Sequence, residues 1–197
     1  MRSSVAVLAL HYQNDVLHAD GKIHVGVVSD GARHAVTQAA RRLLSGARSA
    51  TLPVIHVRIA FKPDYSDCLS NCELFRKVNS LGALQDGTWG AEFLDELKPL
   101  LTETVTKHTR DNPFYLSNLE ELLRGLGVSK VIIAGIATNY AVEHATRHAS
   151  DLGYDVIVAH DACTTAKPHL HAASLETLSL LAGIRSVDEI MHDLQAQ

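Results

Sequence analysis

A run of apolar residues at positions 131–134 constrains the fold of this chain more than any other stretch. The run is β-branched or small throughout and ends at Gly135. Such an unbroken run is typical of a strand that is buried on both faces of a sheet. Beyond it, Ala141, Ala145 and Ala149 recur at the spacing of one helix face. The sequence therefore predicts a strand, a tight turn and a helix, a junction where parallel α/β proteins bind ligands.

Apolar runs and helix-spaced segments alternate along the rest of the chain. This alternation predicts parallel strand–helix–strand units in one sheet whose faces are covered by helices. Ser117, with Glu120 three residues later, has the capping-box pattern of a helix start. Residues 60–91 lack a clear period, which favours a long functional loop with one helical turn near residues 73–78. Strands are predicted at residues 5–10, 54–59, 104–107 and 155–159, helices at 30–45, 93–101, 117–126, 140–150 and 170–182, and a terminal segment at 187–194.

Length, charge and cysteine content bound the class of protein. The chain has 197 residues, 46% of them hydrophobic, which suits a single domain at residues 1–197 with a substantial core. A net charge of -4 provides no basic field, so we expect no nucleic-acid partner and no membrane partner. The first apolar run, residues 5–10, is too short for a signal segment or a spanning helix. Three cysteines, an odd set, fit a reducing compartment, so we expect a cytoplasmic protein.

Several motifs together make the sequence resemble the isochorismatase-like hydrolase superfamily, which includes nicotinamidases, carbamoyl-amide hydrolases and isochorismatases. The resemblance implies a three-layer α/β/α sandwich with a mainly parallel, Rossmann-like sheet of about six strands. It also implies a homodimer or larger homo-oligomer. The motifs are LHYQND at residues 10–15, GTWGA at 87–91, Lys107 followed by NPFY at 112–115, GIATN at 135–139 and DAC at 161–163.

The resemblance implies an Asp-Lys-Cys catalytic triad, of which this chain keeps one member. Lys107 matches the lysine, whereas His11 stands at the place of the aspartate and Ala141 at the place of the cysteine. A methyl group cannot attack a carbon atom, so thioester or thioimidate chemistry at this position is excluded. The amidase or nitrilase route of the family is therefore not expected here.

The backbone around the missing cysteine is expected to persist. In the family, a cis peptide precedes the residue that matches Ala137, and the amides that match Ala137 and Ala141 form an oxyanion hole. Main-chain donors do not depend on the side chain, so replacement of the cysteine by alanine leaves them in place. The alternative is that residues 135–139 are simply a strand-to-helix turn.

His11 and Lys107 form the catalytic hypothesis. Isochorismatases carry a small residue at the cysteine position and use the aspartate as a proton donor, a pattern that Ala141 fits. An imidazole also acts as a general acid or base near neutral pH, so we hypothesise an altered acid/base pair of His11 and Lys107 over the oxyanion cradle. The alternative is that His11 only bonds the backbone at the end of a strand.

Aromatic residues in the irregular segment are expected to border the pocket. Trp89, Phe61 and Tyr140 are predicted to contact a ligand, because aromatic walls give contact area at low entropic cost. Gln13, in the motif after the first strand, is assigned to the same binding set, whereas Asp15 is expected to cap or pair. Phe114 is expected in the core.

No metal and no cofactor are expected. Nicotinamidases bind a metal through Asp and His residues after the second strand, where this chain has RIAF at residues 58–61. Cys68 and Cys72, with His56, only weakly resemble a zinc site, and Cys163 is expected to be structural. Three functions stay open: a small-molecule hydrolase without a cysteine nucleophile, a catalytically silent ligand-binding protein, and an oligomeric scaffold with a vestigial pocket.

Overall fold

One parallel sheet organises the computed structural model, which describes residues 5–24, 26–27 and 29–195. Its strands follow the order β3-β2-β1-β4-β5-β6, and every neighbouring pair runs parallel. This arrangement confirms the expected α/β class with a mainly parallel sheet of about six strands. The strands are β1 (Val5–Leu10), β2 (Val54–Ile59), β3 (Thr104–His108), β4 (Lys130–Ile136), β5 (Asp155–Thr164) and β6 (Gly183–Arg185).

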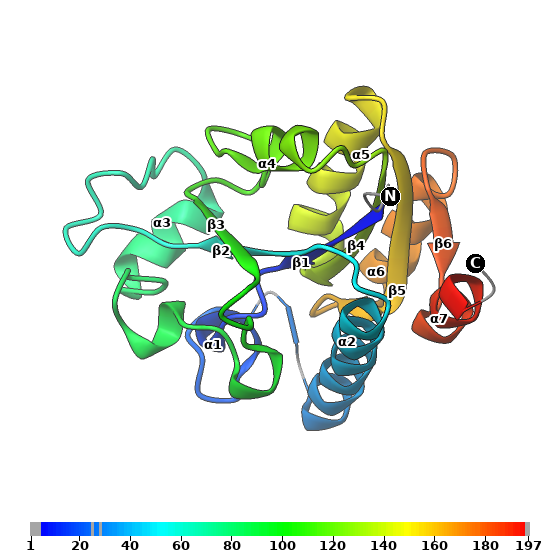
Figure 1. Ribbon diagram of the computed structural model, residues 1–197. Coiled ribbons are helices and arrows are strands. Elements are labelled where there is room, and N and C mark those ends of the chain that lie inside the picture. Colours follow the sequence, from blue (N-terminus) through cyan, green and yellow to red (C-terminus); the bar gives the residue numbers. More distant parts are fainter. Residues whose placement is uncertain (1–4, 25, 28, 196–197) are drawn as a thin grey trace.

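Helices cover both faces of the sheet, as Figure 1 shows. One face packs against α2 (Asp30–Ser49) and α7 (Val187–Gln195), with α1 (Asn14–Leu17) and α3 (Glu73–Ser80) in the same hydrophobic cluster. The other face packs against α4 (Leu119–Gly125), α5 (Glu143–Asp151) and α6 (Pro168–Leu178). No helix among the described residues is long and apolar enough to cross a membrane.

The centre of the sheet lies between β1 and β4, which are almost completely buried. Leu10 pairs with Gly135 in this register, and the two backbones approach closely. A Cβ atom on Gly135 would lie 2.3 Å from the Leu10 carbonyl oxygen, so only glycine fits. The chain leaves β1 toward β2 on one side, and β4 lies on the other side. This reversal of strand order places a ligand crevice at the carboxyl ends of β1 and β4.

Several helices of the structure differ in detail from those that the sequence predicts. Helix α4 begins at Leu119 after Asn118, and Ser117 accepts a hydrogen bond from Leu119 N at 3.3 Å, so the expected capping box at Ser117 is wrong. Within the expected helix at 93–101, only Asp95–Leu97 is helical, as a short 3-10 turn. A π-helical turn, Thr138–Val142, comes before α5 because the chain must turn away from the end of β4.

Candidate functional site

The carboxyl end of β3 places two neighbouring side chains on opposite faces of the sheet, because successive residues of a strand alternate. Lys107 is 44% exposed, and its Nζ lies 3.0 Å from Asp86 Oδ2. His108 is 2% exposed and points into the interior. The structure therefore does not bring Lys107 to His11. It brings His108 instead, a residue that the sequence reasoning did not consider.

His11 and His108 form a direct hydrogen bond in the interior. Their Nε2 atoms lie 2.6 Å apart, and the ring planes differ by 20°. Nδ1 of His11 lies 3.2 Å from the Ile136 carbonyl oxygen. A carbonyl oxygen only accepts, so Nδ1 of His11 carries the hydrogen and its Nε2 accepts from Nε2–H of His108. Both ring nitrogens of His11 are thus occupied by the protein itself.

Burial keeps this histidine pair uncharged near neutral pH. Desolvation lowers the pKa of His11 to about 4, although the Ile136 carbonyl opposes the change. Desolvation, and then the neighbouring His11, lower the pKa of His108 well below its usual value. Nδ1 of His108 has no hydrogen-bond partner in good geometry among the described residues. His11 also has a positive φ of 56°, a left-handed conformation that is uncommon outside glycine and marks a constrained site.

A small inner cavity of about 50 Å³ lies beside this pair. The peptide bond between Ile136 and Ala137 in its wall is cis, in agreement with the family resemblance. A water molecule occupies about 30 Å³ in the liquid, so the inner cavity holds one or two water molecules or one small substituent. Its wall is mostly apolar and consists of His11, Val16, Ile23, Ile59, Leu74, Phe75, Val78, Leu84, Asp111, Ile136, Ala137 and Tyr140.

A larger outer cavity of about 740 Å³ adjoins the inner one. The two cavities share Leu74, Phe75, Asp111 and Tyr140 in their walls. The outer cavity is wide and open, and it adds polar side chains to the apolar ones. These polar groups are Asn71, Glu73, Arg110, Asn112, Tyr115 and His144.

Asp111 stands at the junction of the two cavities. Its side chain is 23% exposed, and Oδ2 lies 3.4 Å from Nε2 of His144. Burial raises the pKa of this carboxyl to about 6, although the neighbouring charges of His144 and Arg110 act in the opposite direction and lower the pKa. Sequence reasoning missed Asp111, because an aspartate in the loop after a strand carries no signal of its burial. The one available signal was its position, four residues after Lys107.

Arg110 is held in place beside the junction. Its guanidinium donates to the Leu69 carbonyl at 2.9 Å and to Asn71 Oδ1 at 3.0 Å. The same group lies 4.1 Å above the centre of the Phe75 ring, a cation–π contact. Arg110 therefore connects the loop before α3 to the end of β3, and it fixes the rim of the outer cavity.

Three residues assigned to the binding set lie elsewhere. Gln13 is fully buried, and its amide bonds both backbone groups of Ile59 and the Ala91 carbonyl, so it clamps loops together. Phe61 is fully buried in the core. Trp89 is half exposed but lines a different pocket, next to α2. Isolated β-bridges of Gln13 with Phe93 and of Phe61 with Gln85 hold two of these residues against neighbouring loops.

The oxyanion residues are only partly at the cavity. Ala137 lines the inner cavity, whereas Ala141 is buried behind it and is not part of the wall. Tyr140 borders both cavities. Cys163 is buried, and burial raises the pKa of its thiol to about 12, so it is a poor nucleophile.

Metal ligands do not gather in the described part of the chain. Within it, no group of three or more His, Cys, Asp or Glu side chains is arranged to hold a metal ion. Asp15 accepts from Lys22 N at 3.2 Å and from Leu84 N at 2.7 Å. Its carboxylate thus ties two loops to the end of β1, in agreement with the expected capping role.

Comparison with known proteins defines the class. Residues 5–189 match the isochorismatase domain, so the chain belongs to the isochorismatase family. The uncharacterized isochorismatase family protein YecD of Escherichia coli O157:H7 is 28% identical over 160 residues, which cover 81% of this chain and 83% of that protein. The ureidoacrylate amidohydrolase RutB of Acinetobacter baylyi is 25% identical over 191 residues, 90% of this chain and 78% of that one.

A solved structure agrees with this assignment. The isochorismatase family protein from Desulfovibrio vulgaris subsp. vulgaris str. Hildenborough superimposes with a TM-score of 0.87 at 26% identity. The match covers 98% of this chain and 99% of that one. The expected superfamily and fold are therefore confirmed over nearly the whole chain.

Proposed function

We propose that this chain is a small-molecule hydrolase that works by proton transfer and forms no covalent bond to its substrate. One observation supports the proposal above all: Asp111 and His11 line the same inner cavity. Burial favours a protonated carboxyl at Asp111 and an uncharged imidazole pair at His11 and His108. Titratable groups whose pKa values are moved in opposite senses are typical of acid/base sites.

Asp111 is the proton donor in the proposed reaction. Its carboxyl gives a proton to the leaving atom of the substrate while the bond between that atom and carbon breaks, and the bonding electrons go to the leaving atom. A water molecule adds its oxygen to the carbon and returns one proton to the Asp111 carboxylate. The substrate thus gains the elements of water, and Asp111 ends as it began. A pKa of about 6 suits this cycle, because both protonation states are accessible near neutral pH.

His11 positions the backbone that faces the substrate. Its Nδ1–H bonds the Ile136 carbonyl, and this carbonyl belongs to the same planar peptide unit as the Ala137 N–H. The bond from His11 therefore fixes the direction of that amide. We assign to the Ala137 N–H the stabilisation of negative charge on the substrate. Lys107 has no part in this proposal.

A second candidate function is ligand binding without turnover. It is favoured by the occupied nitrogens of His11 and by the small size of the inner cavity, about 50 Å³. On this reading the outer cavity holds the ligand, and the inner end admits only water or a methyl-sized group.

Turnover of a defined panel separates the two candidates. The panel contains ureido acids, N-carbamoyl amino acids and a cyclic enol ether acid, chosen because related proteins are named for ureidoacrylate hydrolysis and for isochorismatase activity. Thermal denaturation identifies binding, and mass spectrometry over time identifies hydrolysis. Binding with no change in mass supports the second candidate, and hydrolysis supports the first.

Variants then test the assigned roles on any hydrolysed compound. Asp111→Asn is expected to lower kcat/KM by about 10² to 10⁴-fold and to abolish the decline of activity that accompanies deprotonation above pH 6. Glu121→Gln is the matched control, because Glu121 is an exposed carboxylate on α4 that lines neither cavity. Hydrolysis that survives Asp111→Asn with an unchanged pH profile would refute the proposed function.

A further inference from the structure

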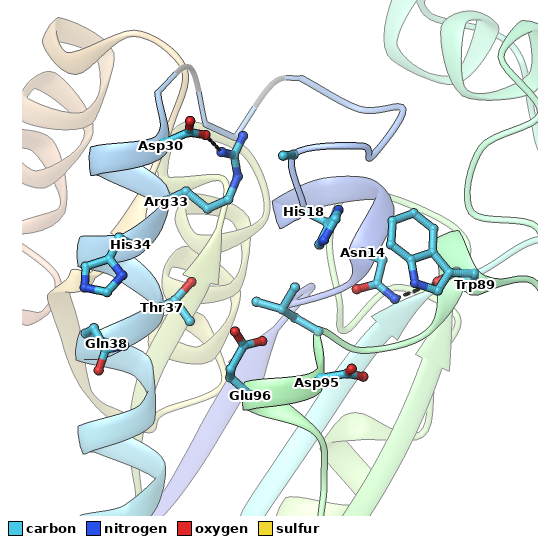
Figure 2. A pocket seen from close by; sticks show the side chains of 12 residues that line it. Asn14, His18, Asp30, Arg33, His34, Thr37, Gln38, Trp89, Asp95 and Glu96 are labelled. Carbon is cyan, nitrogen blue, oxygen red and sulfur yellow. Dashed lines mark hydrogen bonds and ion pairs between the residues drawn. The ribbon is translucent and has the colours of Figure 1, made fainter.

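A third pocket, of about 550 Å³, has a lining that does not include Asp111. Figure 2 shows it between α2 on one side and the Trp89 turn on the other. Its volume falls in the usual range for small-molecule sites, roughly 300 to 1,000 Å³. None of its lining residues belongs to the proposed hydrolase site.

Trp89 forms a fixed aromatic wall of this pocket. Its side chain is 52% exposed, although it is the single tryptophan of the chain. The backbone beneath it is clamped: Asn14 Nδ2 donates to the Trp89 carbonyl at 2.8 Å. Gly90, the next residue, packs so tightly on Asp15 that a Cβ atom would lie 2.2 Å from a carboxylate oxygen. The imidazole of His18 meets the indole edge-on at 5.0 Å. The indole is thus held in place while its surface stays open to a ligand.

A buried hydroxyl faces the pocket from α2. Thr37 is 6% exposed and lines the pocket. Figure 2 shows the hydroxyl turned from α2 toward the space that Trp89 borders. A hydroxyl oxygen has two acceptor lone pairs, so it can accept a hydrogen bond from a donor in the pocket.

The charges around the pocket favour a cation. The Arg33 guanidinium pairs with Asp30, and its Nε donates to the Leu17 carbonyl at 2.7 Å, so it is not available for an anion. Asp95 pairs with Lys98 at 2.6 Å. Glu96 has no ion pair within the described residues, and Figure 2 shows its carboxylate between α2 and the Asn14 side of the pocket. An unpaired carboxylate and an open indole face in the lining of one pocket are a chemical match for an organic ammonium ion.

We propose that this pocket binds a small primary ammonium ion, with its charge at Glu96 and Thr37 and its organic part against Trp89. The ammonium group donates to the Glu96 carboxylate and to Thr37 Oγ1, while the flat or alkyl part covers the indole. This inference does not depend on the proposed hydrolase function, because the two sites share no residue.

The single tryptophan makes the proposal directly testable. Trp89 emission and the indole N–H signal in NMR are followed while 2-phenylethylammonium is added at pH 8, where histidine side chains are ordinarily neutral. A saturable change is expected for this cation. Phenylacetate and 2-phenylethanol, of similar size but negative or neutral, are expected to bind at least about tenfold more weakly, because they lack the charge that Glu96 requires.

Three variants locate the binding. Glu96→Gln is expected to weaken binding of 2-phenylethylammonium about tenfold or more, and Thr37→Val by a smaller factor. Glu92→Gln, an exposed change outside the pocket lining, is expected to leave it unchanged. Equal responses to the cation, the anion and the neutral compound would overturn the proposal. Undiminished binding of the cation by Glu96→Gln would also overturn the proposal. A Trp89 emission that changes only with protein concentration would overturn it too, because it would show that a second copy of the chain covers Trp89.

Discussion

Nε2 of His11 lies 2.6 Å from Nε2 of His108, and His11 in turn lines the inner cavity. They come from β3 and from the end of β1, which are separated in the sheet by β2. The contact is possible because both strands deliver a side chain to the same edge and the same face. An uncharged imidazole thus stands where the family resemblance places the aspartate, and its partner is His108 and not Lys107, the residue that matches the family lysine.

The histidine pair predicts a loss of stability in acid. The pKa of His11 is about 4 in the folded chain and about 6.5 when unfolded, so the unfolded state binds more protons between these values. The stabilisation is complete above pH 6.5 and is lost as pH falls toward 4. The free energy of unfolding is expected to drop by about 2 to 3 kcal/mol from this residue alone.

Denaturant unfolding at pH 7.5 and pH 4.5 measures this effect. His11→Asn is the variant of choice, because asparagine tolerates the positive φ at this position. The variant is expected to lose less stability than the parent chain between the two pH values. Buried His56, whose pKa burial also lowers, is unchanged in both proteins, so the difference isolates the pair. Identical pH dependence in the two proteins would contradict the prediction.

For Asp111 we expect the opposite dependence of stability on pH. Its pKa is raised in the folded chain, so the folded state binds the additional proton between pH 4 and 6. The carboxyl is tolerated below this window and becomes an unfavourable buried charge as pH rises through 6. Asp111→Asn is therefore expected to stabilise the protein by on the order of 2 kcal/mol at pH 8 and not at pH 3.5.

Thermal unfolding at these two pH values provides the measurement. A gain in stability that accompanies a loss of function is the usual mark of a residue retained for activity. His144→Gln supplies a control, because it removes the partner at 3.4 Å but leaves the carboxyl in place. A variant Asp111→Asn that is less stable at pH 8 would show that the carboxylate is structurally required.

Replacement of Lys107 is expected to have almost no effect on stability or turnover. Its ion pair with Asp86 is exposed, and exposed pairs contribute about 0 to 1 kcal/mol. Lys107→Met is expected to change the free energy of unfolding by less than about 1 kcal/mol and any turnover by less than about threefold. Steady-state kinetics beside the Asp111→Asn variant tests this contrast. A loss of turnover of about a hundredfold or more would place the lysine in the site after all.

Replacement of Gln13 is expected to lower the stability of the fold strongly. Its amide makes three hydrogen bonds, to Ile59 N at 2.8 Å, to the Ile59 carbonyl at 2.9 Å and to the Ala91 carbonyl at 2.8 Å. Gln13→Leu keeps the volume but leaves these buried groups unpaired. The free energy of unfolding is expected to fall by about 3 kcal/mol, as measured by urea denaturation. A change below 1 kcal/mol would mean that water replaces the lost bonds.

The sheet was largely predictable from sequence because its central strands are continuous apolar runs. Residues 5–10 and 54–59 were predicted with the same bounds that the structure has. The sixth strand, Gly183–Arg185, was not predicted, since three residues carry no period. Its pairing with β5 is decided by long-range contact and not by local pattern.

The site was predicted only in outline. The turn at Ala137 and the position of His11 followed from motifs, but the partner of His11 depended on which face of β3 looks inward. Lys107 and His108 are adjacent, and the residue types alone favoured the lysine. Asp111 acquires its altered pKa from burial, which a single sequence does not reveal. The homo-oligomeric state and the cytoplasmic location stay predictions.

β3 occupies an edge of the sheet and is held by β2 alone. Because side chains alternate with a period of two, a slip of β3 by a single residue would place Lys107 instead of His108 against His11. An uncharged partner of His11 would then be replaced by a cationic one, with the other strands undisturbed. The charge beside His11 therefore depends on the register of an edge strand. One insertion or deletion in the turns that flank this strand is enough to change that charge.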